Sequence, residues 1–206
     1  MKELTRKPSF LSKLAELIFY SIEYNNKIVV DDPLLPSPFE WPFARKGINF
    51  WGSKSKEGKL FLVGNPLAWY IAFFSVPLFI TLIFIDKILK QRGYELFDEK
   101  DCKFLYQKGG FFLLGYFFHY APFFLMGRAL YLHHYLPAYI FSVLVCASYY
   151  EILSSKIKFL RSKICVSAIC MTLLSVFIKI APLSYGFLVG EEYLNSIKWF
   201  SDWNFI

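Results

Sequence analysis

Three basic side chains, Arg128, His133 and His134, lie in the most hydrophobic part of this sequence. They fall inside FFLMGRALYLHHYLPAYIF, residues 123–141, where apolar and aromatic side chains otherwise dominate. An arginine fork suits the oxygens of a phosphate, and imidazoles donate hydrogen bonds to the same group or move a proton near neutral pH. These residue types therefore indicate a candidate site for a phosphorylated ligand.

Two other interpretations of these three residues stay open from the sequence. In the first, the segment is the polar tip of a helical hairpin, where Arg128 meets lipid phosphates and the histidines face water. In the second, the histidines bind a metal, but adjacent side chains point about 100° apart on a helix and rarely share one ion. Zinc sites prefer histidines at i and i+4, so we predict no metal.

His119 lies further back, in an apolar run that also holds Tyr116 and Tyr120. An ionisable residue within a membrane helix is by default a functional candidate. His119 either extends the phosphate site into the helices or bonds a neighbouring helix as a core histidine.

The composition places the elements that carry these residues in a membrane. Of 206 residues, 56% are apolar, whereas a soluble domain is about 45–50% apolar. Four continuous apolar runs are each about 20 residues long, enough for a helix to cross a hydrocarbon core of roughly 30 Å. They cover residues 67–85, 109–126, 130–150 and 164–183. Since only helices and closed barrels satisfy the backbone in lipid, we predict an all-α integral membrane fold with four transmembrane helices.

The net charge of +7 does not indicate nucleic-acid binding, because the basic residues are spread through loops beside the predicted spans. The loops between spans one and two and between spans three and four hold ten lysines and arginines, against seven on the other side. By the positive-inside rule, both termini and the hairpin around Arg128 are expected to face away from the cytosol.

Residues 1–65 precede the predicted four-helix domain, which covers residues 66–206. Residues 8–24 are expected to form an amphipathic helix with Ser9 as its N-cap. Such a helix either lies in the membrane interface or packs against another domain.

The segment of residues 31–66 is rich in proline and tryptophan, so we expect irregular structure there. Aromatic residues of this segment, together with Trp69 after it, are expected to form a belt at the level of the lipid headgroups. The residues of the segment are Trp41, Phe43, Phe50 and Trp51.

Four stretches of sequence occur in an order that resembles a known family. They read SFLSKLAEL, PSPFEWPFARKGINFW, LVGNPLAWY and GYFFHYAPFFLMGRALYLHHYLPAYIF. Their most specific pieces are Trp41-Pro42, Gly64-Asn65-Pro66, and the block from His119 through Arg128 to His133-His134-Tyr135-Leu136-Pro137. From about Phe10 to about Ser184 the chain resembles the C-terminal region of the protein O-mannosyltransferases, multi-span enzymes of the endoplasmic reticulum and the GT-C glycosyltransferase class.

The resemblance implies transfer of mannose from dolichyl phosphate mannose to serine or threonine of secretory proteins, on the lumenal side. The donor's phosphate is the leaving group and needs cations or hydrogen-bond donors as charge develops on it. The candidates for this site are Arg128, His133, His134, Tyr135 and His119. No other cofactor is expected, and the family implies pairing with another mannosyltransferase subunit.

The carboxylates are where the sequence departs from the family. The family's catalytic Asp-Glu pair belongs to an N-terminal half that, like the lumenal β-trefoil domain after it, has no counterpart here. Asp98-Glu99 and Glu191-Glu192 do not match its position, so we identify no catalytic residue and expect part of an enzyme.

A non-catalytic scaffold or partner subunit of a full-length mannosyltransferase is the alternative from another class. A small transporter with a proton relay through His119 and His133 is disfavoured, because the spans show no pairs broken by Gly or Pro.

Overall fold

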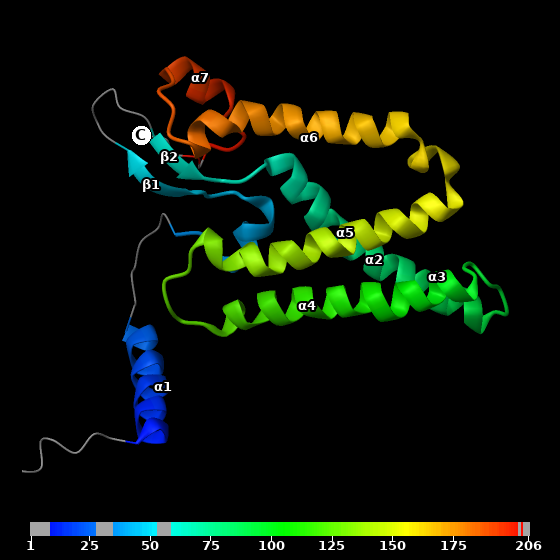
Figure 1. Cartoon of the computed structure of the whole chain (residues 1–206), viewed down its shortest axis with the longest axis horizontal. Coiled ribbons are helices and arrows are strands. Elements are labelled where there is room, and N and C mark those ends of the chain that lie inside the picture. The colour runs from blue at the N-terminus through cyan, green and yellow to red at the C-terminus, as the bar shows by residue number, and fades with distance from the viewer. Residues whose placement is uncertain (1–8, 28–34, 53–58, 202, 204–206) are drawn as a thin grey trace, which may run out of the picture.

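The computed structural model of the chain describes residues 9–27, 35–52, 59–201 and 203. Over these residues it is helical apart from one short hairpin (Figure 1). Helix α5 (Leu136–Lys156) packs against α2 (Pro66–Gln91) and α4 (Gly110–Tyr120), while α6 (Lys163–Ser184) contacts β2 and α2 more closely than α5. The predicted all-α fold class is confirmed.

Three helices within the described residues are long and apolar enough to cross a membrane. They are α2, α6, and α5 extended by the turn before it. Two of them, α2 and α6, cover the predicted spans at 67–85 and 164–183. The second predicted span is instead divided into the π-helical turn η3 (Phe104–Gly109), α4, and the 3-10 turn η4 (Ala121–Leu125). A membrane crossing by the segment predicted at residues 109–126 therefore stays a prediction.

The connection that carries Arg128 is longer than the tight turn expected between residues 126 and 130. Turn η4 ends at Leu125, and the next helical turn is η5 (Leu132–Tyr135), which leads into α5. Two prolines explain the difference. Pro122 lies in η4 and Pro137 in the first turn of α5, and proline fits the first turn of a helix but breaks its interior.

Helix α1 (Phe10–Lys27) lies apart from the other helices (Figure 1). The backbone N–H of Ser12 donates to Ser9 Oγ at 3.2 Å, so the predicted helix and its N-cap are confirmed. Its apolar side chains are exposed, with Phe10 at 77% and Leu11 at 73%. Its location in the membrane interface stays a prediction.

The segment before α2 has more structure than expected. Residues Pro38–Phe43 form the 3-10 helix η2, and β1 (Ile48–Gly52) pairs antiparallel with β2 (Lys59–Leu62). The register joins Ile48 to Leu62 and shifts between Asn49 and Trp51, which marks a β-bulge. Asp31 and Asp32-Pro33 lie outside the described residues.

The prediction of an aromatic belt is wrong for Trp41 and Trp69, because their side chains are buried, at 0% and 3% exposed. The indole N–H of Trp69 donates to the backbone oxygen of Trp41 at 2.7 Å and holds η2 against α2. Phe43 and Phe50 are exposed, as a belt requires, and the side chain of Trp51 lies outside the described set. The two tryptophans instead belong to the core between η2, α2 and α5.

The Gly64-Asn65-Pro66 motif begins α2. Gly64 has a φ of +71° and lies against the ring of Trp69, so a side chain there is strained. The Asn65 side chain accepts from Ala68 N–H and donates to the backbone oxygen of Leu173 in α6 at 2.9 Å. This residue therefore caps α2 and also ties it to α6.

Short helical turns complete the chain. They are α3 (Glu99–Lys103), η6 (Lys158–Arg161) and α7 (Glu191–Ser196). After α7, the fully buried Trp203 donates its indole N–H to the backbone oxygen of Ala44 at 3.0 Å. The end of the described chain is thereby fixed to the C-cap residue of η2.

Candidate functional site

The loop after η4, the turn η5 and the helix η2 bring together five residues that we name the Arg128 cluster: Arg128, Tyr131, His133, His134 and Trp41. Four come from one stretch of seven residues, while Trp41 comes from a part of the sequence much nearer the N-terminus. The predicted grouping of Arg128 with His134 is present in the structure.

The central contact joins Arg128 Nη2 to His134 Nε2 at 3.1 Å. A guanidinium has only donors, so Nε2 must accept and the proton of a neutral ring must be on Nδ1. His134 Nδ1 then donates to the backbone oxygen of Tyr131 at 3.0 Å. The N–H of Tyr131 also lies 3.1 Å from Nδ1, but it bonds there only in the other tautomer, which Arg128 disfavours.

Aromatic rings stack on His134. Its ring is nearly parallel to that of Trp41, with an interplanar angle of 11° and centroids 6.3 Å apart. The ring of His133 lies on it with centroids 4.3 Å apart, and Tyr131 stacks on His133. The stack limits rotation of the imidazole and so helps to fix the direction of Arg128.

Trp41 is the buried base of this stack. Its ring also contacts the edge of Phe123, with centroids 5.1 Å apart. Among the described residues, its indole N–H has no hydrogen-bond partner. A buried donor that is left unpaired is costly, so this N–H is a point of local strain in the core beside the cluster.

Tyr135 was predicted as a site residue, but it lies beneath the cluster. It is fully buried, and its hydroxyl is 3.3 Å from that of Tyr116 on α4. Tyr120 donates from its hydroxyl to the backbone oxygen of Pro38 at 2.8 Å. These tyrosines link α4, η2 and η5. The ring of Tyr135 also lies near that of Trp41, with centroids 6.3 Å apart, so Tyr135 supports the cluster from the core.

His119 lies away from the cluster. Its Nδ1 is 2.8 Å from the backbone oxygen of Gly115, one turn earlier in the same helix. Its ring is exposed and stacks on Phe141 of α5, with centroids 4.8 Å apart. Within the described ranges, no hydrogen bond or ring contact connects His119 with Arg128 or His134.

The acidic pairs singled out in the sequence have local roles in the structure. Asp98 caps α3 by accepting from the N–H of Asp101 at 2.7 Å, and Glu191 and Glu192 lie in the first turn of α7. The part of the chain that the structure describes holds no group of three His, Cys, Asp or Glu side chains suited to a metal. Arg128 supplies the cluster with a guanidinium, which has only hydrogen-bond donors and suits an anion.

Sequence reasoning missed the part of Trp41 in this site. The Trp-Pro pair in a proline-rich segment was assigned to a headgroup belt. Four side chains, from Trp69, Tyr70, Tyr120 and Trp203, donate to backbone oxygens of residues 38–44. These donors lie 27 to 159 residues from their acceptors along the sequence, so no local sequence pattern predicts these hydrogen bonds.

Comparison with known proteins agrees with the resemblance of the motifs. Residues 10–203 match the model of the C-terminal four-transmembrane region of protein O-mannosyltransferases. The chain is 33% identical over 149 residues to dolichyl-phosphate-mannose–protein mannosyltransferase 4 of Saccharomyces cerevisiae, covering 72% of this chain and 20% of that protein. It is 30% identical to protein O-mannosyl-transferase 2 of Danio rerio, covering 97% of this chain and 28% of the relative.

A solved structure gives the same result in three dimensions. The chain superposes on the S. cerevisiae protein O-mannosyltransferase Pmt1-Pmt2 complex bound to the sugar donor with a TM-score of 0.83 and 30% identity. The match covers 96% of this chain and 27% of the matched chain, so the protein spans about a quarter of the length of such relatives. The chain belongs to the protein O-mannosyltransferase family and corresponds to its C-terminal four-transmembrane region.

Proposed function

We propose that this chain forms the C-terminal membrane part of a protein O-mannosyltransferase and binds the phosphate of dolichyl phosphate mannose at the Arg128 cluster. The observation that carries the proposal is Arg128 held by His134, with His134 stacked on the buried Trp41. The names of the relatives supply the donor. An arginine fork is the side chain best suited to bind two phosphate oxygens at once.

The cluster contributes binding and orientation to the reaction. As mannose leaves, negative charge grows on the donor's phosphate, and a fixed guanidinium stabilises it without having to reorganise. The neutral His134 ring orients Arg128 while leaving the guanidinium its charge. A general base for the acceptor's hydroxyl is supplied by another part of the enzyme, because no carboxylate is assigned that role here.

Acceptors, location and assembly follow the family. The acceptors are serine and threonine hydroxyls of secretory proteins, and the chain is a multi-pass protein of the endoplasmic reticulum membrane with both termini lumenal. The solved relative is a complex of two mannosyltransferases, so a second subunit of this kind, identical or different, is the proposed partner.

Cysteine labelling tests the orientation. Gly127→Cys and Phe159→Cys suit this purpose, because position 127 has open space around it and Phe159 is 67% exposed. In a background without the four native cysteines, a membrane-impermeant reagent should label position 127 only from the lumenal side and position 159 only from the cytosolic side. The reverse pattern contradicts the proposed orientation.

Mannose transfer tests the function. The chain is expressed in membranes that hold no other such enzyme, alone or with the family's N-terminal part as a separate chain, and labelled donor and a serine/threonine-rich peptide are added. We expect transfer only with both parts, and its loss in Arg128→Ala but not in the control Arg92→Ala, an exposed arginine after α2. Equal transfer by both variants contradicts a role for the cluster.

A non-catalytic partner subunit is the second candidate, and the surface of α6 supports it. Only 6% of the most apolar stretch of α6 is buried within the described structure. This helix therefore presents an apolar face to lipid or to another protein. Co-purification with a full-length homologue whose activity does not change in Arg128→Ala is the result that favours this alternative.

A further inference from the structure

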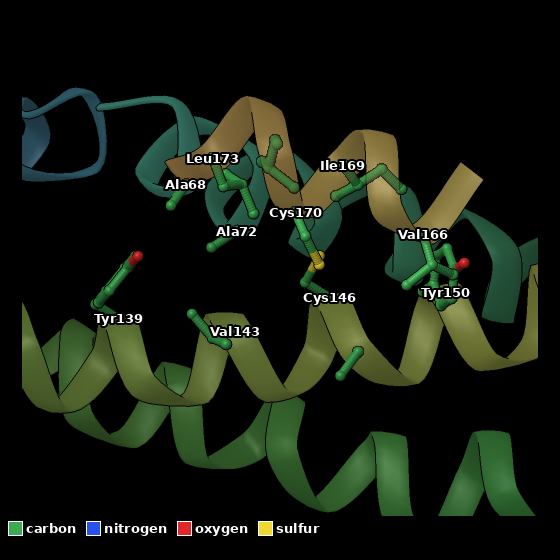
Figure 2. A pocket seen from close by; sticks show the side chains of 12 residues that line it. Ala68, Ala72, Tyr139, Val143, Cys146, Tyr150, Val166, Ile169, Cys170 and Leu173 are labelled. Carbon is green, nitrogen blue, oxygen red and sulfur yellow. The ribbon is translucent and has the colours of Figure 1, made fainter. Parts of the chain in front are cut away.

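A cavity of about 480 Å³ lies between α2, α5 and α6, and none of its lining residues belongs to the Arg128 cluster. Its walls are almost entirely apolar. Figure 2 shows Ala72, Val143 and Ile169 on these walls, with Cys146 of α5 and Cys170 of α6 pointing toward one another across it. The three helices that line it are those that, among the described residues, are long and apolar enough to cross a membrane.

The length and the apolar walls of the cavity suit a hydrocarbon chain. On α5 the lining runs from Tyr139 to Tyr150, a rise of about 16 Å. We call this long apolar space the slot.

One end of the slot lies beside the basic connection between α5 and α6. Tyr150 lines this end, and its hydroxyl donates to the backbone oxygen of Leu160 in η6. Turn η6 carries the exposed cations Lys158 and Arg161, and the exposed Lys163 begins α6. Arg161 pairs with Glu151 at 3.2 Å, but in the described part of the chain the two lysines form no ion pair. Their positive charge is available to an anion beside this end of the slot.

We propose that this slot binds an anionic membrane phospholipid, with one acyl chain between α2, α5 and α6 and the headgroup phosphate at Lys158 and Lys163. Basic residues beside a gap between membrane helices are typical of sites for anionic headgroups. The apolar walls exclude the headgroup from the slot, so the lipid can enter in one orientation only. The site does not depend on the proposed function or on which side of the membrane the turn faces.

The experiment uses the 206-residue chain in lipid vesicles that hold a phospholipid with a photoreactive group in its acyl chain. Phosphatidylglycerol, which is anionic, is compared with phosphatidylcholine bearing the same chain, and the crosslinked peptides are mapped by mass spectrometry. We expect crosslinks on residues 143–150 and 166–173, with a preference for the anionic lipid on the order of tenfold, since each lysine adds about 1 kcal/mol near a surface.

Two variants separate binding of the lipid's acyl chain from binding of its headgroup. Ala147→Phe, at an exposed alanine that lines the slot, should abolish crosslinking there with both lipids. Lys158→Gln/Lys163→Gln should keep the crosslinks but bring the two lipids to parity. The control Lys100→Gln/Lys103→Gln alters exposed lysines of α3, which do not line the slot, and should change neither result.

Three outcomes overturn the proposal. Crosslinks that persist in Ala147→Phe place the lipid elsewhere. Equal labelling by the two lipids in the unaltered chain removes the headgroup site. The absence of crosslinks in the slot with both lipids shows that no acyl chain occupies it.

Discussion

Two cations of this chain, Arg128 and Lys90, differ in the kind of side chain that holds them. At the Arg128 cluster, the guanidinium meets a neutral imidazole that is stacked on a buried indole. Toward the C-terminal end of α2, Lys90 Nζ meets the carboxylate of Asp86 at 2.8 Å. An imidazole orients a cation without cancelling its charge, whereas a carboxylate neutralises it.

The Asp86 site has the features of a structural ion pair. Asp86 is fully buried, and its Oδ2 also accepts from the hydroxyl of Tyr106 at 2.6 Å. Tyr106 comes from the π-helical turn η3, and Lys90 also reaches Cys102 Sγ at 2.9 Å. These contacts join α2, α3 and η3. The two sites therefore differ in the partner that is seen at the cation, which is a neutral ring at Arg128 and a buried carboxylate at Lys90.

The largest expected effect comes from the base of the Arg128 cluster. Trp41→Ala removes a fully buried indole and should lower the free energy of unfolding by about 3–5 kcal/mol. Denaturant unfolding in detergent measures this change. The control Trp199→Ala alters an exposed tryptophan and should cost about 1 kcal/mol or less; equal losses would show that Trp41 is not the support described.

The second prediction concerns the Asp86 pair. Lys90→Met leaves a buried carboxylate without its cation and should cost about 3 kcal/mol of stability. Asp86→Leu removes the buried charge itself, and Lys90, which is 37% exposed, can turn to water, so its cost should be much smaller. Unfolding midpoints of the two variants decide the order. The reverse order contradicts a structural ion pair, and neither variant should alter binding of lipid phosphate.

The third prediction concerns the packing that joins α4 to α5. A Cβ on Gly115 would lie 2.3 Å from the ring of Phe141, so Gly115→Ala should cost about 1–3 kcal/mol. Because His119 stacks on the same ring, its NMR resonances should shift as well. Gly127→Ala is the control, since a Cβ there meets nothing within 4 Å; similar unfolding of both variants would contradict the close approach.

The smallest expected change in free energy is that of Arg128→Lys, and it tests whether Arg128 contributes to ligand binding or to stability. Arg128→Lys keeps the charge but loses the two-pronged fork, so affinity for a lipid phosphate should fall about tenfold, which is about 1.4 kcal/mol. The unfolding midpoint should not change. Arg92→Lys, at an exposed arginine, should alter neither quantity, and a loss of stability in Arg128→Lys would assign Arg128 to the fold instead.

Much of the fold could be predicted because apolar runs of helical length are a local signal. The run at 164–183 predicts α6, observed at Lys163–Ser184, almost residue for residue. The third predicted span begins at residue 130, before the observed start of α5 at Leu136, although Pro137 marks the first turn of that helix. The burial of Trp41 could not be predicted, because hydrogen bonds from side chains far along the chain hold η2 in place.

The site shows the same division. Arg128 and the two histidines could be identified by residue type, but the sequence does not distinguish His133 from His134. Their difference arises from turn η5, which points His134 at Arg128 and the backbone of Tyr131 and leaves His133 exposed. The family resemblance groups Tyr135 and His119 with them, whereas the structure places Tyr135 in the core and leaves His119 exposed.

The most direct test of the central claim is the affinity of the purified chain for dolichyl phosphate, measured in detergent for the unaltered chain, Arg128→Ala and the control Arg92→Ala. We expect Arg128→Ala to weaken binding at least tenfold, since a charge-assisted bond contributes about 1.5–3 kcal/mol, while Arg92→Ala should bind like the unaltered chain. Equal affinity of all three proteins would contradict the assignment of the Arg128 cluster to the donor's phosphate.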